Sequence, residues 1–357
     1  MRARLRVLRA GPGATIQDGG RHGFLRFGVT PAGPMDWTAF RTANLTLGND
    51  DRAAALEISA GGLSALCEDA PLAVAFAGGA FIWRRDGVLL PQAARLLLRP
   101  GEVLAAQAGS FGAWAYLAVE GGFDAPLDMG SRATHVRSGM GGVEGRMLRQ
   151  GDVLFADLLP AAARMQSLEA SEFDAAIDAP WLARDAEAFR VVLGPQDDYF
   201  TAAGLTAFFA EEFTLTPRAD RMAYRFEGPE IAHARGHDIV SDGIALGAIQ
   251  IAGDKKPLVL LADRQPTGGY PKLGHVILAD IGRLAQMRPG EACRFAAVGL
   301  TEARAALFRL EDEIAATPSL LHPLRREPTS KALIEANLID GVVNALEGSS
   351  QYCDWPN

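Results

Sequence analysis

The residues most suited to chemistry lie in glycine-rich loops rather than on the periodic faces of helices or strands. The first loop, residues 15–21, places Gln17, Asp18 and Arg21 around two glycines. Glycines allow the backbone to approach a ligand closely, and an amide, a carboxylate and a guanidinium supply donors and acceptors for a planar polar group. We interpret this segment as a substrate loop; a solvent-exposed turn with a local ion pair is the alternative.

A second loop is rich in positive charge. It covers residues 130–146 and carries Arg132, Thr134, His135 and Arg146. Flexible backbone beside several cations suits an anion such as a carboxylate or a phosphate. Because no Gly-Lys-Ser/Thr follows, the segment is not a Walker-type nucleotide loop.

The densest polar cluster is residues 263–272, which follow the strongest apolar run of the chain, 257–262. This order predicts a loop at the end of a strand, where binding residues are common. A hairpin decorated with polar groups is the alternative. The candidate residues of this loop are Asp263, Gln265, Thr267, Gly268, Gly269, Tyr270 and Lys272.

Composition argues against several classes of function. The net charge of −8 argues against nucleic-acid binding, which requires a basic surface. No apolar run approaches 18 residues and none follows the basic N-terminus, so we expect no membrane span and a cytoplasmic protein. The three cysteines are far apart, and His233 and His237 lack a third ligand, so we expect neither a disulfide framework nor a metal site.

The elements that position these loops are mostly short apolar strands. The 39 glycines and 20 prolines suit many tight turns, a pattern typical of β-barrels or sandwiches. A few helices interrupt the pattern where the apolar spacing changes. They are expected over 34–47, 197–210, 275–287, 301–316 and 329–346, and the last two each open with a Thr N-cap.

The chain divides into two β-rich domains, and two sequence echoes indicate that they are tandem copies. Residues 6–12 resemble 190–195, and the sequence Arg-Pro-Gly-Glu occurs at both 99–102 and 288–291. Coincidence between common turn sequences is the alternative. The expected organisation is a first β-barrel domain at 1–158, a linker at 159–186, a second β-barrel domain at 187–300 and a helical C-terminal extension at 301–357, which we expect to serve as an interface.

Taken in order, these segments resemble the allophanate hydrolase subunit 2 family. That family includes the C-type subunits of 5-oxoprolinase and KipA-like proteins, and it is similar to the carboxyltransferase part of urea carboxylase. The resemblance extends from about residue 5 to about residue 298. The matching stretches are 15–23, 33–36, 43–44, 48–49, 56–57, 130–135, 145–146, 151–152, 194–200, 220–225, 241–250, 263–272 and 285–290.

The resemblance implies a mainly β fold of tandem cyclophilin-like β-barrels with a few helices. It also implies a subunit-1-like partner, which is the B-type subunit in 5-oxoprolinase, and a LamB/YcsF-like A-type subunit, with the site near the contact with the partner. The implied ligands are a small amide substrate and ATP shared with a partner subunit. Biotin is the alternative cofactor, and it would be carried on another protein because this chain has no Ala-Met-Lys-Met acceptor.

The resemblance and the loops together define the candidate site. Cations for a phosphate and a base for water are the groups that ATP-assisted lactam opening needs. The candidate catalytic residues are Asp18, Asp242, Asp263 and Lys272, and we expect Asp18, Arg21, Asp263 and Lys272 to line one cleft between the domains. The other candidate substrate-binding residues are Gln17, Asp36, Asn44, Arg132, Thr134, His135, Arg146, Ser241, Gln250, Gln265, Thr267, Gly268, Gly269 and Tyr270.

Three functions remain open at this point. The first is a subunit of an ATP-dependent 5-oxoprolinase, which opens 5-oxo-L-proline to L-glutamate. The second is a biotin-dependent carboxyltransferase subunit that acts on urea or a related amide. The third is a non-catalytic regulatory binding protein of the KipA type, for which the polar groups of the loops need not converge.

Overall fold

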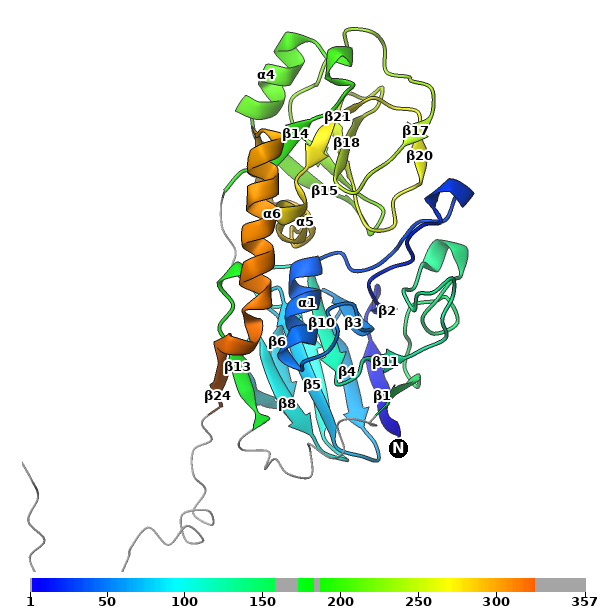
Figure 1. The fold of residues 1–357 in the computed structure, drawn as a ribbon, viewed down its shortest axis with the longest axis vertical. Helices are drawn as coiled ribbons and strands as arrows, with labels where there is room; N and C mark the ends of the chain where they lie inside the picture. The colour runs from blue at the N-terminus through cyan, green and yellow to red at the C-terminus, as the bar shows by residue number, and fades with distance from the viewer. Residues whose placement is uncertain (1, 158–172, 183–186, 325–357) are drawn as a thin grey trace, which may run out of the picture. The chain divides into compact units, whose positions relative to one another are not determined.

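The computed structural model describes residues 2–157, 173–182 and 187–324, and residues up to 323 form one compact unit (Figure 1). Strands dominate this part of the chain, which confirms the predicted mainly β fold. The α-helices among these residues are α1 (Trp37–Thr46), α4 (Ala202–Ala210), α5 (Leu278–Ala285) and α6 (Leu300–Ala315).

The first half of the compact unit contains two seven-stranded sheets. One has the order β11 (Phe123–Asp124), β12 (Val153–Asp157), β1 (Arg2–Ala10), β4 (Leu63–Cys67), β9 (Val103–Gln107), β6 (Ile82–Arg85) and β7 (Val88–Leu89). The other has the order β2 (Thr15–Gln17), β3 (Ala55–Ser59), β10 (Trp114–Val119), β5 (Leu72–Gly78), β8 (Ala94–Leu98), β13 (Ala175–Ile177) and β24 (Leu321–Pro323).

The strands β5 and β10 form the centre of the first half. Every residue of both strands is buried, which explains why they read in the sequence as continuous apolar runs instead of alternating patterns. They pair antiparallel, and α1 packs against both of them. The helix begins after Asp36, whose side chain accepts a hydrogen bond from the backbone N–H of Ala39, as expected of an N-cap.

The second half is built on one eight-stranded sheet. Its order is β22 (Ala292–Cys293), β15 (Phe213–Ala219), β16 (Ala223–Glu227), β19 (Pro257–Leu260), β18 (Ala248–Ile251), β21 (Lys272–Val276), β14 (Phe189–Leu193) and β23 (Phe295–Ala297). The two edge strands, β22 and β23, are separated by one residue in the chain, so the sheet curls into a nearly closed barrel. A short pair, β17 (Asp242–Gly243) and β20 (Thr267–Gly268), lies beside it.

The helix predictions were partly right. The helices expected at 34–47 and 301–316 are α1 and α6, but α6 has Gly299 as its N-cap, so the predicted Thr N-cap at 301 is wrong. The helix expected at 197–210 begins only at residue 202, after Thr201, whose hydroxyl caps it. The helix predicted at 329–346 lies outside the described residues.

The start of the helix predicted at 275–287 was wrong for a tertiary reason. His275 and Val276 end β21, where they pair with β14, and α5 begins at Leu278. Apolar spacing could not separate the strand from the helix that follows it, because Val276 is buried in the strand while Ile281 and Leu284 are buried in the helix.

The Arg-Pro-Gly-Glu echo corresponds to one turn geometry. In both the 99–102 turn and the 288–291 turn, the backbone N–H of the arginine donates to the carboxylate of the glutamate, at 2.9 and 3.1 Å. Their glycines have φ near +90°, in the left-handed region that favours glycine. The turn at 149–152, with the sequence Arg-Gln-Gly-Asp, has the same design. Turn chemistry therefore accounts for this echo, and tandem duplication stays a prediction.

Candidate functional site

The loop at 15–21 and the loop at 131–135 lie against each other in the first half, and together we call them the Arg21 loops. Asp18 joins them, because its carboxylate accepts hydrogen bonds from the backbone N–H of Gly20 at 2.8 Å, from the Ser131 hydroxyl at 2.5 Å and from the backbone N–H of Arg132 at 2.5 Å. These three hydrogen bonds make the Asp18 side chain the acceptor that organises the loops.

Buried polar side chains reinforce the contact between the Arg21 loops. Gln17 is fully buried, and its amide donates to the backbone oxygen of Thr134 at 3.0 Å while its carbonyl accepts from the backbone N–H of Gly33. Thr134 donates from its hydroxyl to the backbone oxygen of Ile16 at 2.8 Å. Gln17 and Thr134 are therefore committed to positioning the loops.

Three donors of the Arg21 loops, one each on Arg21, Arg132 and His135, have no acceptor among the described residues. Arg21 is 1% exposed; its Nη2 donates to the backbone oxygen of Ala133 and its Nε to that of Asp128, but its buried Nη1 has no partner. His135 contacts the Ser138 hydroxyl through Nδ1, and its buried Nε2 has no partner. Burial lowers the pKa of the His135 imidazole, so the ring is neutral at pH 7.

An ion-paired triad joins the two halves next to these loops. Arg221, from the turn between β15 and β16, donates to the carboxylate of Glu57 on β3 and forms two 2.9 Å hydrogen bonds with Asp263. Its Nη2 also donates to the backbone oxygen of Gly33 at 2.7 Å. Burial by itself would lower the pKa of Arg221, but the two facing carboxylates raise it, so the guanidinium stays charged. Asp263 is in turn close enough to Arg21 and His135 to act on their charges.

The triad continues into a buried chain of hydrogen bonds. The Tyr116 hydroxyl donates to Glu57 at 2.8 Å and accepts from the backbone N–H of Asp36 at 2.8 Å. We call the contact between the two halves the seam. Gln286, which follows α5 in the second half, donates across the seam to the Asp36 carboxylate at 2.7 Å. Burial raises the pKa of Asp36, and the hydrogen bond from Gln286 opposes that shift. Asp36, a predicted substrate-binding residue, is thus part of the connection between the halves.

A separate polar group lies in the second half around Lys272. The Lys272 side chain is 4% exposed, and its ammonium lies 3.0 Å from the Asp242 carboxylate. Gln250 pairs in register with Lys272 and accepts a weak hydrogen bond from Gln265 at 3.5 Å. The interaction with Lys272 lowers the pKa of the Asp242 carboxyl. The Lys272 backbone N–H donates to the Gln196 side chain at 2.9 Å, and the contacts of Lys272 among the described residues include neither Arg21 nor Asp263.

The glycines of the 263–272 loop fit closely around this second group. A Cβ on Gly268 would approach the Gln250 amide nitrogen to 2.6 Å, so a side chain there would displace the glutamine. Thr267 and Gly268 form β20, which pairs with Asp242 and Gly243. Ser241, Gly269 and Tyr270 flank this pair, and the Tyr270 side chain is exposed.

Three other predicted residues have local structural contacts. Asn44 of α1 is buried and binds the backbone oxygen of Ala53 at 3.0 Å. Arg146 forms a two-point contact with Asp152 at 2.8 and 2.9 Å, which closes a loop beside the 149–152 turn. The Arg132 guanidinium faces Asp124 at 3.7 Å. Their roles in substrate binding stay predictions.

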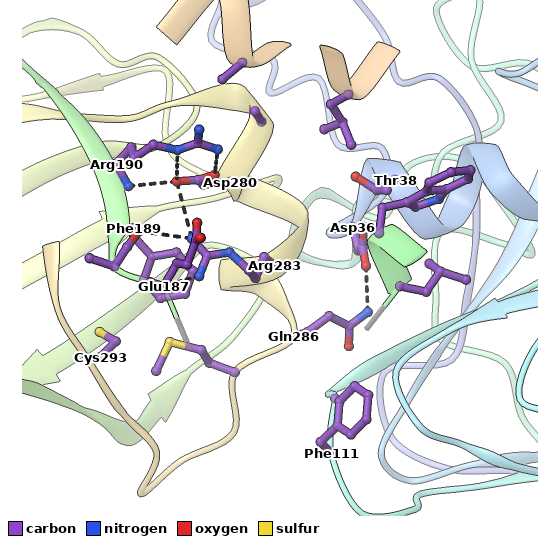
Figure 2. A pocket seen from close by; sticks show the side chains of 18 of the residues that line it. Asp36, Thr38, Phe111, Glu187, Phe189, Arg190, Asp280, Arg283, Gln286 and Cys293 are labelled. Carbon is purple, nitrogen blue, oxygen red and sulfur yellow. Dashed lines mark hydrogen bonds and ion pairs between the residues drawn. The ribbon is translucent and has the colours of Figure 1, made fainter. Parts of the chain in front are cut away.

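A cavity of about 610 Å³ lies elsewhere on the seam (Figure 2). Asp36 and Gln286 lie on one side of it, and Arg190, Asp280 and Arg283 lie on the other. Two of its charged groups, Arg190 and Asp280, are paired through hydrogen bonds of 2.6 and 3.1 Å. Of the predicted site residues, Asp36 alone lines this cavity. We therefore place the candidate site at the Arg21 loops, where buried donors are available.

Sequence reasoning missed the most connected residues of the seam. Glu57, Tyr116, Arg221 and Gln286 were not among the candidates, although the stretches containing Glu57 and Arg221 were noted as family matches. A signal existed at Glu57, since it is a lone charge inside the apolar strand β3 and is fully buried. A charge in such a position requires a partner, which here comes from 164 residues away.

The described residues show neither a metal-binding cluster nor a membrane-spanning helix. Within 2–157, 173–182 and 187–324, no three His, Cys, Asp or Glu side chains converge as metal ligands would. None of the helices in these ranges combines the length and the apolar character needed to cross a membrane.

Comparison with known proteins gives consistent relatives. Residues 27–297 match the family model described as "Carboxyltransferase domain, subdomain A and B". The C-type subunit of the 5-oxoprolinase of Escherichia coli (strain K12) is 36% identical over 301 residues, covering 84% of this chain and 93% of the relative. The protein of the same name from Haemophilus influenzae is 34% identical with the same coverage.

Solved structures extend the likeness to larger enzymes. The urea carboxylase of Kluyveromyces lactis superposes with a TM-score of 0.79 at 28% identity, over 91% of this chain and 31% of that one. The K. lactis urea amidolyase superposes with a TM-score of 0.80 at 27% identity, over 91% of this chain. The match covers 21% of the amidolyase, so this chain spans about a fifth of that enzyme's length.

Proposed function

This chain belongs to the family of carboxyltransferase domains with subdomains A and B, and on that premise we propose that it is the C-type subunit of an ATP-dependent 5-oxoprolinase. The relationship to the E. coli protein carries the proposal, because it extends over 93% of that relative. The proposed reaction is the opening of 5-oxo-L-proline to L-glutamate, together with B-type and A-type partner subunits.

The geometry of the Arg21 loops supports a site for a small polar amide. A lactam carbonyl is a poor electrophile, and donors aimed at its oxygen or at a neighbouring anionic group stabilise the charge that develops when it is attacked. Arg21 Nη1 and His135 Nε2 are buried donors without acceptors in the described chain. Asp263 lies close to both and is held by Arg221, so the site combines donors with a fixed negative charge.

ATP would supply a phosphoryl group that converts the amide oxygen into a leaving group. The chain offers cations for such a group at Arg21 and Arg132, but the sequence contains no Gly-Lys-Ser/Thr phosphate loop. We therefore assign the nucleotide chiefly to a partner protein and the binding of the amide to this chain. On this proposal the isolated chain is nearly inactive.

A biotin-dependent carboxyltransferase is the second candidate. The superposition with urea carboxylase over 91% of this chain favours it, and both proposals use the same seam. In that case the Arg21 loops would receive the ureido ring or the carboxylate of a carboxybiotin held on another protein, and urea or a related amide would be the acceptor.

Reconstitution distinguishes the two candidates. The chain is purified alone and with its B-type and A-type partners, and ADP release and glutamate formation are measured with 5-oxo-L-proline. We expect both products only from the assembled enzyme, in equal amounts. Carboxylation of urea by the chain with a carboxylated biotin carrier, without glutamate formation by the assembly, would replace the proposal by the second candidate. Robust turnover by the lone chain would contradict the division of labour.

A further inference from the structure

The buried guanidinium of Arg21 has hydrogen-bond acceptors for only some of its donors. Its Nη2 and Nε bind backbone oxygens of Ala133 and Asp128, while its Nη1 has no acceptor within the described residues. A buried donor of a charged group that lacks a partner costs more free energy than a neutral one. The fold tolerates this cost at a position that is 1% exposed.

His135 presents a second donor to the same region. If the Ser138 hydroxyl donates to Nδ1, the neutral ring carries its proton on Nε2, and that N–H has no acceptor among the described residues. Arg21 Nη2 binds the backbone oxygen of Ala133, two residues before His135, and lies against Gly141, which follows the bridge partner of His135. Arg21 Nη1 and His135 Nε2, one from each of the two Arg21 loops, are thus a pair of donors without acceptors in the described chain.

Three carboxylates, those of Asp128, Asp18 and Asp263, act on the charge of Arg21, and the last two are already committed to other donors. Asp18 accepts from Gly20, Ser131 and Arg132, and both oxygens of Asp263 accept from Arg221. Within the described chain, none of the three carboxylates accepts a hydrogen bond from Arg21 Nη1. A bound molecule can therefore supply the acceptor that completes the pair.

We propose that Arg21 Nη1 and His135 Nε2 bind the carboxylate of the substrate, one oxygen each. This inference rests on the proposed function, since it assigns which part of 5-oxo-L-proline the loops recognise. A carboxylate is planar, carries two acceptor oxygens and matches two convergent donors, one of them cationic. The pair thereby selects a lactam that bears a carboxylate over a neutral lactam or urea.

The test compares two ligands that differ only in the carboxylate. The affinities of 5-oxo-L-proline and 2-pyrrolidinone for the assembled enzyme are measured by calorimetry without ATP, for the wild type and for Arg21→Gln. We expect the wild type to bind 5-oxo-L-proline about 10- to 100-fold more tightly, as a charge-assisted hydrogen bond would give, and Arg21→Gln to bind both ligands alike. A carboxylate preference that survives in Arg21→Gln, or an equal loss for both ligands, overturns the inference.

Matched variants separate recognition from folding. Arg26→Gln removes the same charge from an exposed position five residues away and is expected to keep the preference. His135→Gln retains a donor near the Nε2 position, whereas His135→Phe removes it; we expect the first to keep most of the preference and the second to reduce it. If Arg21→Gln fails to fold, as judged by circular dichroism, the two His135 variants decide, and equal preferences in both overturn the inference.

A second probe separates this inference from the proposed function. Acetate and acetamide are compared for their effect on the Tm of the full chain, at an ionic strength fixed with chloride. If the assembled enzyme forms no glutamate, the proposed function fails, but a rise in Tm with acetate alone that disappears in Arg21→Gln still supports the carboxylate site. Equal effects of acetate and acetamide on the wild type contradict it.

Discussion

Arg221, whose side chain is 10% exposed, and Arg21, which is 1% exposed, are both largely shielded from solvent, but the protein satisfies their hydrogen bonds differently. All three nitrogens of Arg221 reach oxygens of Glu57, Asp263 or Gly33. Arg21 reaches two backbone oxygens and leaves Nη1 without an acceptor in the described chain. The fold supplies acceptors for every nitrogen of Arg221 but for only two of the three nitrogens of Arg21.

This difference separates architecture from binding. A buried ion pair that is fully hydrogen-bonded fixes how two parts of a chain meet, although its net contribution to stability over apolar residues is modest. A buried donor left open costs stability and persists where function requires it. We therefore assign Arg221 to the joining of the halves and Arg21 to ligand binding.

The largest expected effect on stability comes from removing the ion pairs of Arg221. Arg221→Met leaves Glu57 and Asp263 buried without their counter-ion, so we expect the free energy of unfolding to fall by about 3–5 kcal/mol. Urea denaturation followed by circular dichroism measures the loss. Arg225→Met is the matched control; Arg225 pairs with Asp254 at a partly exposed position, and its loss should cost under about 1 kcal/mol. Similar losses in both variants would remove the distinction drawn for Arg221.

An intermediate effect is expected at the carboxylate that organises the Arg21 loops. Asp18→Asn replaces one acceptor oxygen by an NH₂ group facing the donors of Gly20, Ser131 and Arg132, so we expect a loss of about 1–3 kcal/mol as well as weaker substrate binding. Asp50→Asn is the control, because exposed Asp50 accepts from one backbone N–H. An unchanged unfolding curve for Asp18→Asn would show that the loops hold together without it.

The smallest effect is a pH dependence centred on His135. Burial lowers the pKa of this ring below the ordinary value of 6.5, and the charges of Asp263, Arg221, Arg21 and Arg137 also act on it. A lowered pKa means that the folded state favours the neutral ring. The stability it contributes is therefore complete above pH 6.5 and is lost as the pH falls through the lowered pKa.

Unfolding free energies of the wild type and His135→Gln, measured between about pH 5 and pH 8, check this expectation. The difference between the two proteins should change below about pH 6.5 and be constant above it. His22→Gln, at an exposed histidine in the neighbouring loop, should follow the wild type. A difference that changes only at alkaline pH would show that His135 is not the titrating group.

Much of the fold was predictable because local patterns determine it. The buried strand β5 and the helix α1 follow from apolar runs and from spacing that the chain itself displays. The errors occurred where tertiary pairing decided the outcome, as at His275, which joins β21 although its neighbours suggest a helix. Strand order in the large sheets is set by contacts between distant segments, which single-sequence patterns do not encode.

The candidate site was predictable only in its loops. The combination of Asp18 and Arg21 among glycines indicated a binding loop, and in the structure the charges of Asp18 and Asp263 both act on Arg21. The cleft expected to join these residues to Lys272 stays a prediction; the observed ion pair of Lys272 is with Asp242. Pairings such as Glu57 with Arg221 could not be predicted, because nothing in either segment identifies its partner.

The separation of Glu57 and Arg221 by 164 residues also has a consequence for biosynthesis. Ribosomes add about 5–20 residues per second, so Glu57 is made roughly 8–33 seconds before Arg221. During that interval Glu57 has no counter-ion. The strand β3 can then be buried only if the Glu57 carboxyl group is protonated or hydrated. Nascent chains of this protein are therefore expected to keep the surroundings of Glu57 accessible to water until the second half emerges. Chaperones and proteases should act on the chain most readily at this stage.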